Sequence, residues 1–278
     1  MSYKIVLDSS GELPQNLNND PRFEHVPLTL MVGGETIVDD ETFNQKEYLQ
    51  KVAACSECAK SACPSPERYM ESYETEAEDI YVITLSSKLS GSYNSACLGK
   101  QLYEENKGAK NIHVIDSESA SVGQTQIALR IVEYYEQGKC FEEICPLIDQ
   151  YRDEMRTYFV LDNLDTLRKN GRLTRTKAVV ASTLSIKPVM GAEKGEIIQL
   201  GQAMGIKKAL QKLADLAIKN AGNSKEKRLM ISHCNCPDRA EIMKKLLLER
   251  GEYRDIIIVN MAGLSSTYAN DGGIIVTI

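Results

Sequence analysis

The sequence predicts an α/β protein of two domains, in which a mostly parallel sheet with flanking helices precedes a smaller α+β part. Strands and helices alternate along the first half, and the predicted strands there are apolar and rich in β-branched residues. The second half mixes hairpins with helices. A chain of 278 residues is also long enough for two ordinary domains. We therefore expect an N-terminal domain over residues 1–155 and a C-terminal domain over residues 156–278.

The first half begins with a short apolar strand at Tyr3–Asp8, which ends in a turn signature of Asp, Ser and Gly. A second strand is expected over His25–Val32, and Thr36–Val38 can pair back against it after a Gly-Gly turn. Ile80–Leu85 and Asn111–Ile115 have the composition of buried strands. The expected helices are Glu67–Tyr73, Leu89–Asn106, Val122–Gln137 and Phe141–Asp153.

The second half opens with a strand at Thr157–Leu161, followed by a basic helical stretch to about Leu184. Ile186–Met190 and Glu196–Gln202 are predicted to form a hairpin around a loop at Ala192–Gly195. The remaining elements are helices at Ile206–Ala221 and Asp238–Arg250, with Pro237 as the first helical residue, and strands at Arg228–Ser232, Arg254–Asn260 and Ile274–Ile278.

The bulk composition excludes several classes of function. A net charge of −6 repels phosphate, so the chain is not expected to bind nucleic acid or anionic membranes generally. No apolar run approaches the roughly 18 residues of a membrane span, and the N-terminus becomes polar too early for a signal peptide. We therefore expect a cytoplasmic protein without membrane insertion, whose eight cysteines stay reduced.

The segment Leu85–Ala96 lies where a buried strand ends and a helix begins. Ligands of open parallel sheets bind at such carboxyl ends, and a helix start offers unpaired N–H groups to an anion. Gly91 lets the backbone approach a ligand, while Ser90 and Ser92 add hydroxyl donors. The alternative is a serine that only caps the helix, but four serines and a glycine exceed what a cap requires. The segment therefore predicts a carboxylate or phosphate site.

An enzymatic alternative is a serine-dependent hydrolase or phosphatase that uses Ser90 as its nucleophile. The chain contains no Walker-type phosphate loop, no dinucleotide-binding glycine motif and no nucleophile elbow. A nucleophilic Ser90 needs a base, and His25, His113 and His233 all lie in or beside predicted strands. Each is better explained as a structural histidine, although the sequence leaves open that one folds back to Ser90.

The cysteines raise the question of a metal site. Cys55 and Cys58 have C-x₂-C spacing, with Cys63 nearby, and Cys234 and Cys236 follow His233. A structural zinc site usually needs two such pairs in tight turns. Here the first pair is expected in a helical segment and the second follows a strand. We therefore expect neither a metal nor another cofactor.

A basic run in this acidic chain is a candidate docking patch for an acidic partner or a phosphorylated substrate. A solvated surface explains it equally well. The run consists of Arg168, Lys169, Arg172, Arg175 and Lys177.

Taken in order, these motifs resemble those of the DegV family over nearly the whole chain. The most specific match is Ser86–Tyr93, which is close to the family's Ser-Ser-x-Leu-Ser-Gly-Thr-Tyr. Ser61–Ser65 occupies the place of Thr-Ser-Gln-Pro. The other matching segments are Asp8–Ser10, Val26–Leu28, Asp116–Ser117, Asn170–Leu173 (for Gly-Gly-Arg-hydrophobic) and Ile186–Pro188.

The resemblance implies a lipid-binding protein similar to the fatty-acid-binding subunit of bacterial fatty acid kinase. A long-chain fatty acid would lie between two α/β domains, with its carboxylate held by Ser61 and Ser90. A separate ATP-dependent kinase would then phosphorylate the carboxylate for phospholipid synthesis, so the chain itself would not be an enzyme. By the same resemblance, Arg172 and its basic neighbours would face the kinase.

The sequence departs from the family pattern at several positions. Ser61 replaces the usual Thr, which keeps the hydroxyl but loses a methyl group that stiffens the rotamer. Met204 lies where many members have an Arg, and Tyr268–Gly273 replaces the usual His-Thr-Gly-Pro-Gly. Tyr268 can still donate a hydrogen bond to a ligand, so we include it among the candidate binding residues.

Overall fold

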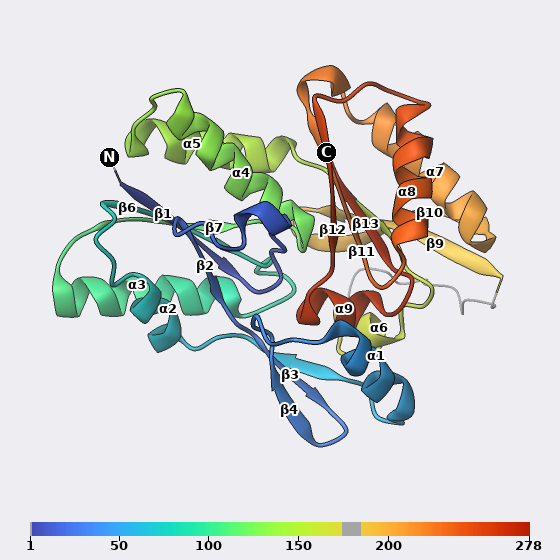
Figure 1. Ribbon diagram of the computed structural model, residues 1–278, viewed down its shortest axis with the longest axis horizontal. Helices are drawn as coiled ribbons and strands as arrows, with labels where there is room; N and C mark the ends of the chain where they lie inside the picture. The colour runs from blue at the N-terminus through green and yellow to red at the C-terminus, as the bar shows by residue number, and fades with distance from the viewer. Residues whose placement is uncertain (1, 174–184) are drawn as a thin grey trace.

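The computed structural model describes residues 2–173 and 185–278, which form a mixed α/β fold with three sheets (Figure 1). The predicted fold class is confirmed. The predicted domain boundary near residue 155 falls in the link between a helix and the first strand of the largest sheet. The division into two domains remains a prediction.

The N-terminal sheet has four strands, and every neighbouring pair is parallel. Their order is β2 (Phe23–Val26), β1 (Tyr3–Asp8), β6 (Asp79–Thr84) and β7 (Asn111–Asp116). Helices cover both faces, as predicted. One face packs on α2 (Pro66–Ser72) and α3 (Ser92–Lys107), and the other on α4 (Val122–Glu136) and α5 (Phe141–Glu154). Residues alternate between the two faces, as the two-residue period of a strand requires: Val82 faces α2 and α3, while Ile83 faces α4 and α5.

A small antiparallel sheet follows the first strands of the parallel sheet, in the order β4 (Glu35–Val38), β3 (Thr29–Val32) and β5 (Lys60–Ala62). The predicted pairing of Thr36–Val38 is confirmed, since Met31 lies opposite Thr36. The single strand predicted over His25–Val32 is wrong. Pro27 lacks an N–H for the ladder, and the chain leaves the parallel sheet there and enters the small sheet at Thr29.

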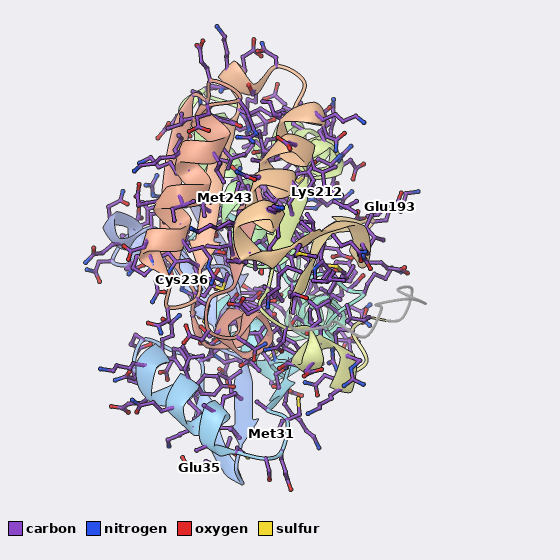
Figure 2. All side chains as sticks on the ribbon, turned by 90° about the vertical axis from the view of Figure 1, so that its right-hand side faces the viewer. Met31, Glu35, Glu193, Lys212, Cys236 and Met243 are labelled. Atoms are coloured by element: carbon purple, nitrogen blue, oxygen red, sulfur yellow. The ribbon has the colours of Figure 1, made fainter. Side chains whose placement is uncertain are left out.

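The six-stranded C-terminal sheet is mostly antiparallel, and only β11 and β12 run parallel. Its order is β10 (Glu196–Met204), β9 (Ile186–Glu193), β8 (Thr157–Val160), β13 (Ile274–Thr277), β11 (Arg228–His233) and β12 (Asp255–Asn260). One face packs on α7 (Gly205–Lys219) and α8 (Pro237–Leu248). Figure 2 shows these helices side by side, with Lys212 on α7 and Met243 on α8, while Met31 and Glu35 mark the β3–β4 hairpin at the opposite end.

Local start and turn signals mark several boundaries in the structure. Ser65 caps α2 by accepting a hydrogen bond from the N–H of Arg68 at 3.3 Å, and Pro66 follows as the first helical residue. Pro237 begins α8 in the same way. The β9–β10 hairpin turns through Lys194 and Gly195, which both have positive φ angles.

Some elements differ from the prediction. Helix α9 (Gly263–Ala269) and strand β5 were not predicted, and the helical segment expected around Cys55 and Cys58 lies earlier, as α1 (Gln45–Ala54). Cys55 ends α1 and Cys58 lies beyond it, so the expectation that this pair lies within a helix is wrong. Of the basic helix expected up to Leu184, the structure shows only α6 (Asp165–Lys169), and the part over residues 174–184 lies outside the described residues. Two short 3₁₀ helices span Gln15–Leu17 and Ser224–Glu226.

The described helices were also compared with the requirements of a membrane span. Within residues 2–173 and 185–278, none combines sufficient length with sufficient apolar character to cross a bilayer.

Candidate functional site

A cavity of about 340 Å³ lies between the carboxyl edge of the parallel sheet and the inner face of the six-stranded sheet. Its volume is within the range of small-molecule sites. Segments that follow β1, β6 and β7 line one side, and β8, the β9–β10 hairpin and α9 line the other. The expectation that a ligand site forms past the ends of the parallel strands therefore coincides with an observed cavity.

Most of the cavity wall is apolar. Thr157, Phe159 and Leu161 alternate along the chain at β8 and so face the cavity together. Tyr158, between them, faces the core under α7 and α8 instead. The other apolar lining residues include Leu85, Leu89, Ala120, Leu167, Ile197, Leu264, Ala269 and Ile275. A wall of this kind suits a hydrocarbon chain.

Two hydroxyl groups on the cavity wall lie close together although 207 positions separate them in the sequence. Ser61 Oγ and Tyr268 Oη are 3.0 Å apart and share a hydrogen bond. Ser61 lies on β5 and Tyr268 on α9, and both line the cavity. Two predicted binding residues are thus brought together by elements that the sequence did not predict.

The serine-rich segment before α3 also lies at the cavity. Ser90 and Gly91 are part of the lining. Ser92 is fully buried and does not line the cavity; its hydroxyl lies 2.9 Å from Ser90 Oγ, and its N–H donates to that same oxygen at 3.2 Å. The structure therefore places Ser90 on the wall with Ser92 behind it. A Cβ on Gly91 would lie 3.0 Å from Cys63 Sγ, so the backbone here approaches the Ser61–Cys63 segment closely.

Two aspartates fix the loop that carries Ser90. Asp8 Oδ2 accepts a hydrogen bond from the N–H of Leu85 at 2.7 Å, and Asp116 Oδ1 accepts one from the N–H of Ser87 at 3.0 Å. Asp8 is fully buried, and burial raises the pKa of its carboxyl group. These contacts give the two Asp-Ser motifs of the sequence a structural function at the cavity.

The predicted basic residues lie in different environments. Arg172 lines the cavity, and its Nε donates to the carbonyl of Leu89 at 3.2 Å. Arg168 and Lys169 are exposed at the end of α6. Arg175 lies outside the described residues, as does Lys177. The sequence did not predict that Arg172 lines the cavity. The turn after α6 directs its side chain to the loop that carries Ser90, and the sequence pattern did not define that turn.

The histidines have partners away from Ser90. His25 Nε2 lies 2.8 Å from the carbonyl oxygen of Gly11, and His113 Nε2 lies 3.5 Å from Asp149. His233 Nδ1 lies 3.4 Å from the N–H of Cys236. None of these contacts supplies a base to Ser90.

The cysteines do not form a common cluster in the described part of the chain, where no group of three or more potential metal ligands occurs. Cys63 is exposed at the cavity wall, and Cys234 is buried beside α9.

The chain was compared with known protein families and with known proteins. A family model described as "Uncharacterised protein, DegV family" matches residues 2–277. A DegV domain-containing protein from Streptococcus gordonii is 35% identical over 278 residues, covering 99% of this chain and 98% of the relative.

Two solved structures share the fold over the whole chain. A DegV family protein from Ruminococcus gnavus, refined with vaccenic acid, is 51% identical with a TM-score of 0.98, and each chain is covered completely. The Streptococcus pneumoniae Fatty Acid Kinase (Fak) B3 protein, solved loaded with linoleic acid, is 33% identical with a TM-score of 0.89, covering 100% of this chain and 99% of that one. On the family match, the sequence identity and the shared fold, this chain belongs to the DegV family.

Proposed function

We propose that this protein binds a long-chain fatty acid in the cavity, with the carboxylate held by Ser61 and Ser90 and assisted by Tyr268. The observation that carries this proposal is that the lining of the cavity combines a large apolar surface with the hydroxyl groups of Ser61, Ser90 and Tyr268. The fatty acids in the two related structures support the same ligand class.

The affinity follows from the physical chemistry of such a ligand. Burying an acyl chain gains about 0.8 kcal/mol per methylene group, so the apolar wall supplies most of the binding free energy. The carboxylate needs a few hydrogen-bond donors, which the serine and tyrosine hydroxyls provide. Arg172 adds a positive charge at the wall, which favours an anionic head group.

We further propose that the chain presents the bound acid to a separate ATP-dependent fatty acid kinase and performs no catalysis itself. The relative named Fatty Acid Kinase (Fak) B3 supports this pairing. In the described residues, Arg168 and Lys169 are exposed near Arg172 in the sequence, where an acidic partner can dock by competing with Asp165 for the Arg168 guanidinium, 3.2 Å away. Among the described residues, the contacts of Ser90 do not favour the alternative of a serine hydrolase or phosphatase.

Substitution of Ser90 tests the fatty-acid site. Ser90→Ala removes a charge-assisted hydrogen bond worth about 1.5–3 kcal/mol, so the affinity for vaccenic acid should fall roughly 10- to 100-fold in a fluorescence displacement titration. Ser87→Ala is the matched control, since Ser87 lies in the same loop but does not line the cavity. Equal affinities in the wild type and Ser90→Ala would show that the head group lies elsewhere.

Charge reversal tests the kinase surface. The double variant Arg168→Glu and Lys169→Glu should slow acyl phosphate formation in a mixture with the kinase at least tenfold, because like charges then oppose docking. Vaccenic acid binding should be unchanged, since neither residue lines the cavity. Lys225→Glu, at an exposed and similarly ion-paired position in the Ser224–Glu226 3₁₀ helix, is the control. Full acyl phosphate formation by the double variant would exclude this docking surface.

A further inference from the structure

The N-terminus of α9 is held by two carboxylates from the first 40 residues of the chain. Asp39 Oδ1 accepts the N–H of Gly263 at 2.6 Å, and Asp39 Oδ2 accepts the N–H of Leu264 at 2.8 Å. Glu12 Oε1 accepts the N–H of Ala262 at 3.2 Å. Three successive backbone donors are thereby satisfied by side chains that are distant in sequence.

Both carboxylates are buried, with exposed fractions of 2% for Asp39 and 6% for Glu12. Neither forms an ion pair with a residue of the described ranges; their other partners include the hydroxyls of Ser9, at 2.8 Å from Asp39, and Ser121, at 2.6 Å from Glu12. Burying a carboxyl group is costly, and burial raises the pKa of both groups, so their hydrogen bonds offset only part of that cost. The hydrogen bonds to Ala262, Gly263 and Leu264 define where α9 begins.

Helix α9 carries several residues of the cavity lining, so its position determines where they lie. Leu264, Ser265, Tyr268 and Ala269 all line the cavity, and Tyr268 meets Ser61. In Figure 1, α9 lies between the six-stranded sheet and the small sheet with α1. A helix of seven residues is too short to be stable by itself, so its position depends on external contacts.

The small sheet connects the two ends of α9. Asp39 follows β4, at one edge of the sheet, and caps the start of the helix. Ser61 lies on β5, at the opposite edge, and contacts Tyr268 near the helix end. The distance between Asp39 and Ser61 is therefore fixed by the strand pairing, and it sets the place of Tyr268.

The approach of the helix to Asp39 is close. A Cβ on Gly263 would lie 2.5 Å from Asp39 Oδ1 and 2.6 Å from Leu30 Cδ1, so this position accepts only glycine without displacement. Helix α1 supports the arrangement from the side, because Tyr48 Oη lies 2.6 Å from Thr267 Oγ1.

We propose that Asp39 and Glu12 are positioning residues that hold α9 in the place where Tyr268 and Ser61 together receive the ligand head group. This inference rests on the proposed fatty-acid function. Neither residue lines the cavity, so each acts through α9 and not by contact with the ligand.

A double-mutant cycle with vaccenic acid tests the proposal. Asp39→Asn replaces one accepting oxygen by an amide group that cannot accept, so it should lower the affinity about tenfold. In a Tyr268→Phe background, the same substitution should lower the affinity less than about twofold, because the group being positioned has been removed. An equal loss in both backgrounds would indicate a purely structural function and would overturn the proposal.

Two further variants distinguish an effect of α9 displacement on affinity from an effect of general destabilisation. Glu133→Gln weakens ion pairs to Arg228 and Arg254, which join α4 to the C-terminal part away from α9, and should leave the affinity unchanged. Gly263→Ala should reproduce the Asp39→Asn effect through displacement of α9, and it remains available if Asp39→Asn does not fold.

Amide hydrogen exchange provides a readout that does not depend on the ligand. In Asp39→Asn, the amides of residues 263–269 should exchange at least tenfold faster than in the wild type, while those of α7 are unchanged. Unchanged exchange in α9 would contradict the positioning function. Failure of the wild type to bind vaccenic acid, with accelerated exchange in the variant, would instead reject the proposed fatty-acid function alone.

Discussion

Glu12 shows how a buried residue at the edge of the site couples its ionisation to folding. Burial raises the pKa of its carboxyl group from 4.5 to about 7, against the opposing effect of hydrogen bonds from Ser121 and Ala262. Ser265 and the Cys234 thiol are its other polar neighbours. Because the folded state keeps a proton that the unfolded chain releases between pH 4.5 and 7, this group destabilises the fold as pH rises through that window.

Glu12→Gln should therefore become more stable relative to the wild type as pH increases. The difference in unfolding free energy should grow from pH 4.5 to 7, by up to about 3 kcal/mol, and stay constant above pH 7. Urea unfolding at pH 5, 6, 7 and 8 measures it. Asp8 and Asp39 titrate in both proteins and cancel in the comparison. Parallel stability curves for the two proteins would show that Glu12 does not change its protonation on unfolding.

The β9–β10 hairpin closes the cavity against the Ser86–Ser90 loop. Ser86 Oγ donates to the carbonyl of Gly195 at 2.8 Å, and Gly195 adopts a φ of +79°. A Cβ there would lie 2.5 Å from Ser86 Oγ. One hairpin turn thus contacts the loop that positions Ser90.

Gly195→Ala should destabilise the protein and weaken fatty acid binding. Gly138→Ala is the matched control, since Gly138 has a φ of +78° with no atom within 4 Å of its added Cβ. Both changes incur the backbone cost of about 1–2 kcal/mol, and only Gly195→Ala adds a cost of about 1–3 kcal/mol for displacing Ser86. Urea unfolding and vaccenic acid titration measure the two effects. Identical behaviour of the two variants would show that the hairpin contact has no energetic importance.

The elements that the sequence predicted well carry their own signals. All six residues of β6 are buried, and the apolar run Ile80–Ile83 within it identified the strand. Helices α2 and α8 begin with Pro at the first helical position. The break at Pro27 was missed because apolar residues continue on both sides of it, and only the pairing partners show that two different sheets are involved.

Helix α9 escaped prediction for a different physical reason. Its sequence, Gly263–Ala269, is dominated by small and polar residues that favour turns. Asp39 and Glu12 cap the start of the helix from another part of the chain, and such tertiary contacts leave no local pattern. The same limit applies to the site: Ser90 followed from a local motif, whereas its proximity to Tyr268 and Arg172 depended on the fold.

At the scale of the whole molecule, the cavity joins parts of the chain that are otherwise separate. The parallel sheet presents the Ser90 loop, the small sheet presents Ser61, and the six-stranded sheet supplies the apolar face of β8. Met204, one of the positions at which the sequence departs from the expected family pattern, is 68% exposed and does not line the cavity. The departure at Met204 therefore leaves the cavity wall itself unchanged.

The most direct test of the central claim is native mass spectrometry of the purified protein, followed by solvent extraction and identification of the released lipid. A fatty-acid-binding protein should carry one long-chain fatty acid per chain, or take up added vaccenic acid in that ratio, and Ser90→Ala should retain much less of it. A wild-type chain that carries no lipid and rejects added fatty acids, while remaining folded, would contradict the account.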